Sequence, residues 1–319
     1  MLSRKAGRTR CLENQPSPGM NVKKHPFLFG FLLVGLVIIV FYGLALLSFS
    51  VFSGKSFKSP GSLVGGSAIG VIEINGIIMD SKEIVNQIVD FTKDSDIKAI
   101  LVRIDSPGGA VGPSQEIHRE LVRAATSKKV IASLGGTAAS GGYYIACAAN
   151  KIMANEGTLT GSIGVRMDFV NVEGVYKWVG LKTSVIKSGK YKDIGSASRE
   201  MTPEEHELLQ SVIDDVYSQF VDAVAQGRNM KREDVVPFAD GRIFTGRQAQ
   251  KNGFVDEIGN FRDAVKLAAT LVNIKGEPEL VYPPKKHGME LFRMFFDEAL
   301  SKAVQGLVEQ EDGKLYYKY

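Results

Sequence analysis

The stretch IKAILVRIDSPGG (97–109) decides the fold class. Its first nine residues are mostly aliphatic, which is typical of a strand that is buried on both faces of a sheet. The run ends at a Ser-Pro-Gly-Gly turn, and residues 113–125 then place apolar side chains at helical spacing. A buried strand, a glycine-rich turn and a helix in this order predict one unit of a parallel α/β domain.

The same order recurs on both sides of this unit. AIGVIEINGII (68–78) predicts the preceding strand, and an amphipathic helix is expected from Lys82 to about Lys93. KKVIASLGG (128–136) predicts the next strand, with a helix that begins near Ser140. Further strands are expected at 151–157, 181–189 and within 276–285, and further helices at 201–227 and 260–272. The pattern indicates an α/β domain with largely parallel strands, in which functional residues gather at the carboxyl ends of the strands.

The amino-terminal region predicts a membrane anchor. Residues 27–52 carry no charge and include FLFGFLLVGLVIIVFYGLALL, a run of about 39 Å as a helix, which is long enough to span a bilayer with some tilt. The run is too long for the apolar core of a cleavable signal peptide, and SFSVFSG after it is a poor cleavage site. Residues 1–25 hold six basic residues against Glu13, so this flank is expected in the cytoplasm and the chain after Phe52 outside.

Charge and cysteine content exclude two classes of protein. The chain has 39 basic and 35 acidic residues, and these nearly balance once the basic tail is set aside, which argues against a nucleic-acid-binding domain. Cys11 and Cys147 are expected on opposite sides of the membrane, so they form no disulfide framework. Cys147 lies in the apolar stretch YYIACAA, where a free cysteine is expected to pack in the core.

GGTAASGGYY (135–144) holds the candidate nucleophile, Ser140. At the start of a helix, free N–H groups and the helix dipole favour a developing negative charge. The flanking glycines permit a strained turn and let a substrate approach the backbone. The pattern is close to the G-x-S-x-G elbow of α/β-hydrolases, but Ala138 stands in the first position. A serine that only caps a helix is the structural alternative.

A serine nucleophile needs a base, and the histidines do not suit this role. The four are His25 in the basic tail, His118 and His206 on helix faces, and His287 in a loop. A lysine can act as the base if its amine is neutral. KSGKYKDIGSASREMTP (187–203) offers Lys187, Lys190 and Lys192, and the pattern alone does not choose among them.

Four motifs carry a resemblance to a known family. RIDSPGGAV (103–111), GGTAASGGYYIA (135–146), TGSIGV (160–165) and KSGKYKDIGSASREMTPEE (187–205) together resemble the signal peptide peptidase A family, in its short bacterial form. The resemblance covers roughly residues 65–275. It implies a membrane-anchored serine peptidase with a Ser–Lys dyad, and neither a cofactor nor a metal. The implied α/β fold is of the ClpP and crotonase type, with repeated β-β-α units preceded by one transmembrane helix.

The resemblance also implies a role for single residues. Ser140 matches the family's nucleophile, Lys192 its general base, and Ser162 a serine that orients the lysine amine. The four glycines around the nucleophile would expose its hydroxyl and leave room for an extended peptide.

Backbone N–H groups would form the oxyanion hole. The residues implied are Gly141 and Gly109, with Gly108 as the neighbouring choice. Asp105 receives no chemical role, because the end of a strand before a turn explains it.

The implied organisation is a cytoplasmic tail at 1–25, an anchor at 26–52, a linker at 53–66, a peptidase domain at 67–275 and a carboxyl-terminal extension at 276–319. The peptidase domain is expected on the periplasmic side of a bacterial inner membrane. Expected substrates are cleaved signal peptides and other unfolded or membrane-derived peptides with small or apolar residues at the cut site. Family members form rings or domes whose active sites are completed by neighbouring subunits, so a homo-oligomer is expected.

Two alternative functions and the partner of the carboxyl-terminal helix stay open. An acyl-CoA enzyme of the crotonase fold also uses paired N–H donors, and a catalytically silent, membrane-tethered scaffold would share the peptidase fold. The amphipathic helix expected in MELFRMFFDEALSKAVQGLVEQ (289–310) would dock on its own domain, on another subunit or on the membrane surface.

Overall fold

The computed structural model describes residues 35–36, 39–40, 43 and 67–284. The chain divides into two units, residues 1–63 and 64–319, and only the second is described further. Among the described residues, no helix has the length and apolar character needed to cross a bilayer. The expected basic tail, linker and carboxyl-terminal amphipathic helix, and nearly all of the expected anchor, lie outside the described residues.

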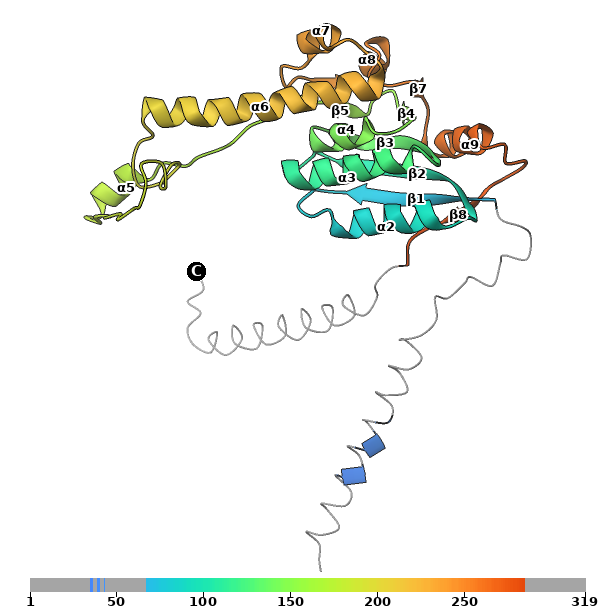
Figure 1. Cartoon of the computed structure of the whole chain (residues 1–319), viewed down its shortest axis with the longest axis horizontal. Coiled ribbons are helices and arrows are strands. Elements are labelled where there is room, and N and C mark those ends of the chain that lie inside the picture. Colours follow the sequence, from blue (N-terminus) through green and yellow to red (C-terminus); the bar gives the residue numbers. More distant parts are fainter. Residues whose placement is uncertain (1–34, 37–38, 41–42, 44–66, 285–319) are drawn as a thin grey trace, which may run out of the picture. The chain divides into compact units, whose positions relative to one another are not determined.

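An eight-stranded, largely parallel sheet organises the domain (Figure 1). The strands follow the order β6-β5-β3-β2-β1-β8, with β4 pairing β3 and β7, and only β5 and β6 are antiparallel. In chain order the elements are β1 (Ala68–Asn75), α2 (Lys82–Lys93), β2 (Ile97–Ser106), α3 (Val111–Ala124), β3 (Lys129–Ala139), α4 (Gly141–Ala146), β4 (Lys151–Ala154), β5 (Leu159–Gly161), α5 (Glu173–Trp178), α6 (Pro203–Arg228), α7 (Arg232–Val235), η2 (Val236–Phe238), β6 (Ile243–Thr245), α8 (Gly246–Lys251), β7 (Glu257–Ile258), α9 (Phe261–Leu271) and β8 (Glu279–Val281).

The expected α/β class is confirmed, but the order of elements differs from repeated β-β-α units. From β1 to α4 each strand is followed by one helix, and β4 and β5 are the consecutive strands before α5. The reason is geometric, because neighbouring parallel strands need a crossover connection, which a helix supplies.

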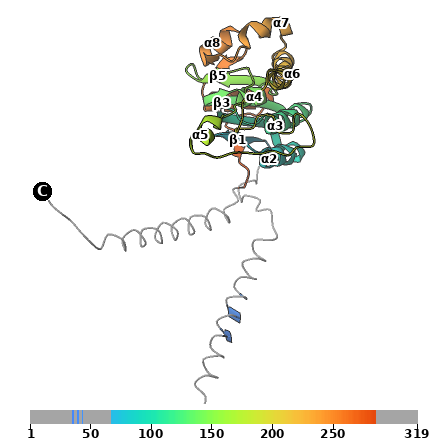
Figure 2. The ribbon, with the colours of Figure 1, turned by 90° about the vertical axis from the view of Figure 1, so that its left-hand side faces the viewer.

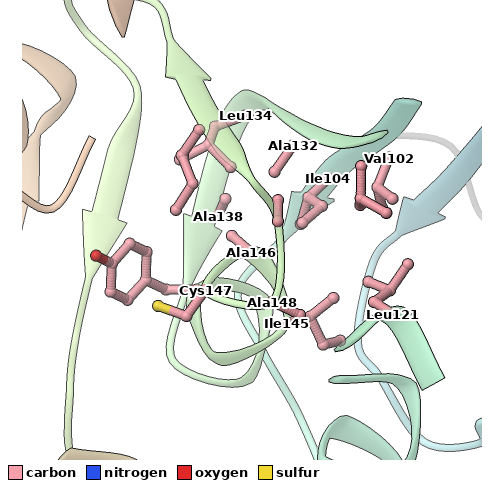
Figure 3. Packing of buried hydrophobic residues seen from close by; sticks show 14 of the residues in the cluster. Val102, Ile104, Leu121, Ala132, Leu134, Ala138, Ile145, Ala146, Cys147 and Ala148 are labelled. Atoms are coloured by element: carbon pink, nitrogen blue, oxygen red, sulfur yellow. The ribbon is translucent and has the colours of Figure 1, made fainter. Parts of the chain in front are cut away.

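Both faces of the sheet are covered, as the apolar run at 97–105 predicts. Ile100, Val102 and Ile104 of β2 pack with residues of α2, α3 and α4 in one buried cluster, part of which is seen in Figure 3. The alternate residues Ala99 and Leu101 pack against α9 in a second cluster. Buried aliphatic side chains each stabilise the fold by about 1.5–3 kcal/mol relative to exposure, so the two clusters hold the single sheet between α2, α3 and α4 on one face and α9 on the other.

A bulge in β3 shifts this strand from one partner to another. β3 pairs with β4 up to Leu134 and with β5 from Thr137 onward. The carboxylate of Asp105 accepts hydrogen bonds from the N–H groups of Gly136 (3.3 Å) and Thr137 (3.1 Å), and a Cβ at Gly135 would lie 2.7 Å from Asp105 Oδ2. Gly135 and Gly136 therefore serve the bulge and not the nucleophile, which corrects the expectation that all four glycines expose the serine.

The segment 181–189 is not the strand that its β-branched residues suggest. All nine residues are exposed, and no strand within residues 67–284 pairs with them. Strand propensity reflects packing on a half-buried surface, and no neighbour in the described part of the chain offers such a surface to this segment.

The long helix is confirmed as α6, with Thr202 at its N-cap and Pro203 at its first position, and it runs past Gly227 to a left-handed cap at Asn229. In Figures 1 and 2, α7 and α8 lie at the β5 end of the molecule.

Candidate active site

Ser140 lies at the carboxyl end of β3, where the chain turns into α4. Its φ of 52° and ψ of −122° are unusual for a residue other than glycine, and such conformations cost on the order of 1–3 kcal/mol. The turn is held by two hydrogen bonds: the N–H of Ser140 donates to the carbonyl of Gly161 (2.8 Å), and the N–H of Tyr144 donates to the carbonyl of Ser140 (2.8 Å). A strained turn that presents a half-buried hydroxyl at a strand end is the geometry expected of a nucleophile.

Ser162 lies beside Ser140 because β3 and β5 are parallel. Ala139 pairs with Gly161 in the register, so the two serines are the next residues along their strands. Ser162 has the same φ of 52°, and its N–H donates to the carbonyl of Arg242 (2.8 Å). Both serines line one open cleft of about 890 Å³. The structure thus brings together two of the residues that the resemblance singles out.

Two backbone N–H groups beside Ser140 are available as donors. The N–H of Gly108 donates to Ser106 Oγ (3.0 Å), whereas no acceptor for those of Gly109 and Gly141 is found among residues 67–284. The two groups are close in space, since a Cβ at Gly141 would lie 3.3 Å from Gly109 N. Between the alternatives Gly108 and Gly109, this geometry favours Gly109 as the oxyanion donor.

A turn of backbone fixes the direction of the Gly109 N–H. The N–H of Ile78 donates to the carbonyl of Gly108 (3.0 Å), and the N–H of Ala110 donates to the carbonyl of Ile78 (2.8 Å). The same contact leaves no room for a side chain, because a Cβ at Gly109 would lie 2.6 Å from Ile78 N. The glycine is needed here for close approach and not for a positive φ.

The three lysines of the motif at 187–205 do not line the cleft. Lys187 pairs with Asp193 (2.5 Å) and Lys190 pairs with Glu204. Lys192 is exposed, and no hydrogen bond or ion pair of its amine is found in the part of the chain that the structure describes. Within one chain, the structure therefore does not bring Lys192 together with Ser140.

Other titratable groups are accounted for by packing. His118 packs against Tyr144 in a tilted arrangement with ring centroids 4.7 Å apart, and burial, followed by the nearby Arg119, lowers the pKa of His118 to about 4. Cys147 is 1% exposed and packs in the buried cluster, which confirms that it belongs to the core, and this burial raises the pKa of its thiol to about 12. Within 67–284, no group of three or more potential ligands gathers that could hold a metal ion.

A small pocket of about 40 Å³ opens beside Ser140. Tyr144 of α4 and the side chains of Val216 and Phe220 of α6 line it, together with Val165. Its walls suit a small or apolar side chain of a bound peptide. Sequence motifs do not indicate the two α6 residues, and their place on the apolar face of the helix is the one signal that could have identified them.

Comparisons with known proteins agree with the motifs. The chain matches Peptidase family S49 over residues 123–275 and the Clp protease family over residues 71–157. A ClpP1 variant from Listeria monocytogenes covers 61% of this chain and 93% of its own with a TM-score of 0.43 and 19% identity.

Three relatives show how far the similarity extends. A putative protease of Synechocystis sp. is 48% identical over 221 residues, which are 68% of this chain and 80% of the relative. A putative signal peptide peptidase SppA of Enterococcus faecium is 36% identical, with 67% of each chain covered. Protease 4 of Salmonella typhi is 39% identical over 69% of this chain, a match that spans about a third (37%) of the longer relative. The chain belongs to the signal peptide peptidase A family of proteases, Peptidase family S49.

Proposed function

We propose that this protein is a serine endopeptidase in which Ser140 is the nucleophile and Lys192 the general base. The observation that carries the proposal is the turn at Ser140. A strained serine at a strand end lies beside the N–H groups of Gly109 and Gly141, for which residues 67–284 supply no acceptor, and beside a second serine, Ser162. A nucleophile next to an oxyanion hole is the arrangement that acyl transfer requires.

The reaction has two stages. The neutral amine of Lys192 takes the proton of Ser140 Oγ as this oxygen attacks a peptide carbonyl, and the N–H groups of Gly109 and Gly141 stabilise the oxyanion. The ammonium group then gives the proton to the leaving amine, the C–N bond breaks, and an acyl-enzyme remains. Water, losing a proton to the amine, attacks the ester and releases Ser140 with its proton restored. Ser162 would hold the amine in line by a hydrogen bond.

We infer that the lysine acts on the serine of a neighbouring subunit. Lys192 is exposed and lies outside the cleft that contains Ser140. Figure 1 shows α5 and the segment after it beyond the amino-terminal end of α6, away from the strands. This region exposes large apolar side chains, among them Trp178 at 86% and Ile186 at 100%. A second copy of the chain would cover them and bring Lys192 to a complete site.

The small pocket beside Ser140 supports short apolar or small side chains as the preferred residues before the cut bond. Cleaved signal peptides and other membrane-derived peptides have this composition and are the substrates we propose. The uncharged run at 27–52 supports an anchor in a bacterial inner membrane, with the peptidase domain in the periplasm.

The test is cleavage of a fluorogenic peptide with alanine or leucine before the bond, by full-length protein in detergent. Wild type should cleave, and Ser140→Ala and Lys192→Ala should fall to background while their melting temperatures and oligomer sizes stay unchanged. Lys251→Ala, at the end of α8, is the matched control and should keep full activity. If Lys192→Ala remains active, another residue is the general base. If the wild type assembles but cleaves no peptide, the alternative of a catalytically silent scaffold is favoured.

A further inference from the structure

Arg199 joins two carboxylates at the segment that carries Lys192. Its Nε and Nη2 donate to the two oxygens of Asp193, each at 3.0 Å, and its Nη1 and Nη2 donate to the two oxygens of Glu205, at 2.8 and 2.6 Å. Both edges of the planar guanidinium group are thus used in bidentate pairs, which fix direction as well as distance. We name these three residues the arginine bridge.

One end of the arginine bridge is fixed to α6. The Glu205 residue is only 3% exposed, and its carboxylate also accepts the N–H of Thr202 (3.0 Å). In return, Thr202 Oγ1 accepts the N–H of Glu205 (3.2 Å), which completes a capping box. The arginine bridge therefore starts from a carboxylate whose position is set by the first turn of a 26-residue helix.

The other end holds the backbone on both sides of Lys192. Asp193, the next residue, also accepts a hydrogen bond from the amine of Lys187 (2.5 Å), and the same amine donates to the carbonyl of Lys190 (2.8 Å). The N–H of Lys192 itself donates to the carbonyl of Gly189 (3.2 Å). In residues 187–200 the described chain forms turns but no strand or α-helix, so these contacts take the place of a sheet or helix ladder.

We propose that Arg199 is a positioning residue for Lys192. By joining Asp193 to Glu205 it fixes the backbone of the lysine relative to α6, and so sets where the amine is presented to Ser140. The inference rests on the proposed function, because Arg199 acts only through Lys192. Proton transfer depends steeply on geometry, and a displacement of about 1 Å can lower a rate by roughly 10²-fold.

The test compares Arg199→Gln, which removes charge and fork, with Arg199→Lys, which keeps the charge alone. Both should lower kcat by about 10- to 100-fold with KM near the wild-type value. Arg247→Gln is the matched control. Arg247 lies on α8 and forms an exposed ion pair with Glu156 (2.8 Å), so its substitution should leave kcat at the wild-type value.

The pH profile separates positioning from a role in folding alone. The ion pairs that the structure shows at this segment are Lys187 with Asp193, Lys190 with Glu204, and Arg199 with Asp193 and Glu205. Loss of the arginine cation leaves an excess of negative charge from Asp193 and Glu205 at this segment, and negative charge favours the protonated form of a base nearby. The acid limb of kcat/KM should therefore move to higher pH in Arg199→Gln and stay in place in Arg199→Lys. A role in folding alone would reduce the amount of assembled enzyme, with kcat per assembled subunit and the acid limb unchanged.

The outcomes also separate this inference from the proposed function. If Lys192→Ala keeps its activity, the assignment of the base is wrong. If Lys192→Ala is inactive but Arg199→Gln has wild-type kcat and an unmoved acid limb, only the positioning role is overturned. If Arg199→Gln fails to assemble, Asp193→Asn is the second variant that tests the positioning role, because it weakens the Arg199–Asp193 pair and leaves the Arg199–Glu205 pair intact. A wild-type kcat in assembled Asp193→Asn would then refute the proposal, and a decrease would support it.

Discussion

The substitution Gly109→Ala tests the oxyanion hole through a steric clash that the backbone cannot avoid. The new Cβ would lie 2.6 Å from the nitrogen and 2.7 Å from the carbonyl carbon of Ile78, and nearer still to its oxygen. Contacts this short with backbone atoms force the turn at Gly108–Ala110 away from Ile78. The N–H of Gly109 then no longer points at the position where the oxyanion forms.

The expected magnitudes follow from what is lost. Removal of one oxyanion donor lowers kcat by about 10²–10³-fold. Two hydrogen bonds between Ile78 and the turn, at 3.0 and 2.8 Å, would be broken or stretched, and at about 0.5–1.5 kcal/mol each this lowers the free energy of unfolding by roughly 1–3 kcal/mol. Gly112→Ala, three residues further on in α3, meets no atom within 4 Å and serves as control.

The assay measures kcat and KM on the fluorogenic peptide together with thermal unfolding of full-length protein. Gly109→Ala should lose most of its kcat while it remains folded and assembled, and Gly112→Ala should keep wild-type kcat and melt at the same temperature or slightly higher. A folded Gly109→Ala enzyme with wild-type kcat would refute the assignment of this N–H to the oxyanion hole.

Three further predictions use other parts of the structure. Ser162→Ala should lower kcat by up to about 10²-fold with little change in KM, because the proposed hydrogen bond that orients the lysine amine is lost; unchanged steady-state kinetics would contradict this role. Gly227→Ala should lower the free energy of unfolding by roughly 1–3 kcal/mol, since its Cβ would lie 2.8 Å from the carbonyl carbon of Cys147, and a wild-type urea midpoint would contradict this. Hydrogen bonds from Arg199 lower the pKa of Glu205 to about 2, below the usual glutamate value of about 4.5, so this carboxyl contributes stability above about pH 4.5 that is lost as the pH falls toward 2. Glu205→Gln should show a shallower loss of stability in acid, and an identical loss would contradict the assignment.

The fold was predictable wherever a local pattern and burial agree. The helix expected at 82–93 and the strand at 97–105 are found within a residue of the expected bounds, because their apolar periodicity reflects the layers that bury them. The segment 181–189 shows the limit of this reasoning. Its β-branched residues would pack well in a sheet, but side chains such as that of Ile186 remain exposed in the single chain.

The candidate site was only partly predictable for a similar reason. Ser140 and Ser162 lie close together because each follows the carboxyl end of one of two neighbouring parallel strands, and a sequence pattern can place such strand ends. The choice of Gly109 over Gly108 as oxyanion donor depends on the hydrogen bond that the N–H of Gly108 donates to the Ser106 hydroxyl. The small pocket beside Ser140 depends on Phe220, which lies on a helix distant in sequence. Such details are set by tertiary contacts between segments far apart in the chain, so no local signal contains them.

A catalytic site shared between subunits can be tested by mixing two inactive proteins, Ser140→Ala and Lys192→Ala. Equal amounts are dissociated, combined and allowed to reassemble, and cleavage of the fluorogenic peptide is then measured at constant total protein. If each site takes its serine from one subunit and its lysine from the next, random mixing restores roughly a quarter of wild-type activity. If reassembled mixtures of confirmed size stay at background while reassembled wild type is active, the two residues do not form a site between subunits, and the account is contradicted.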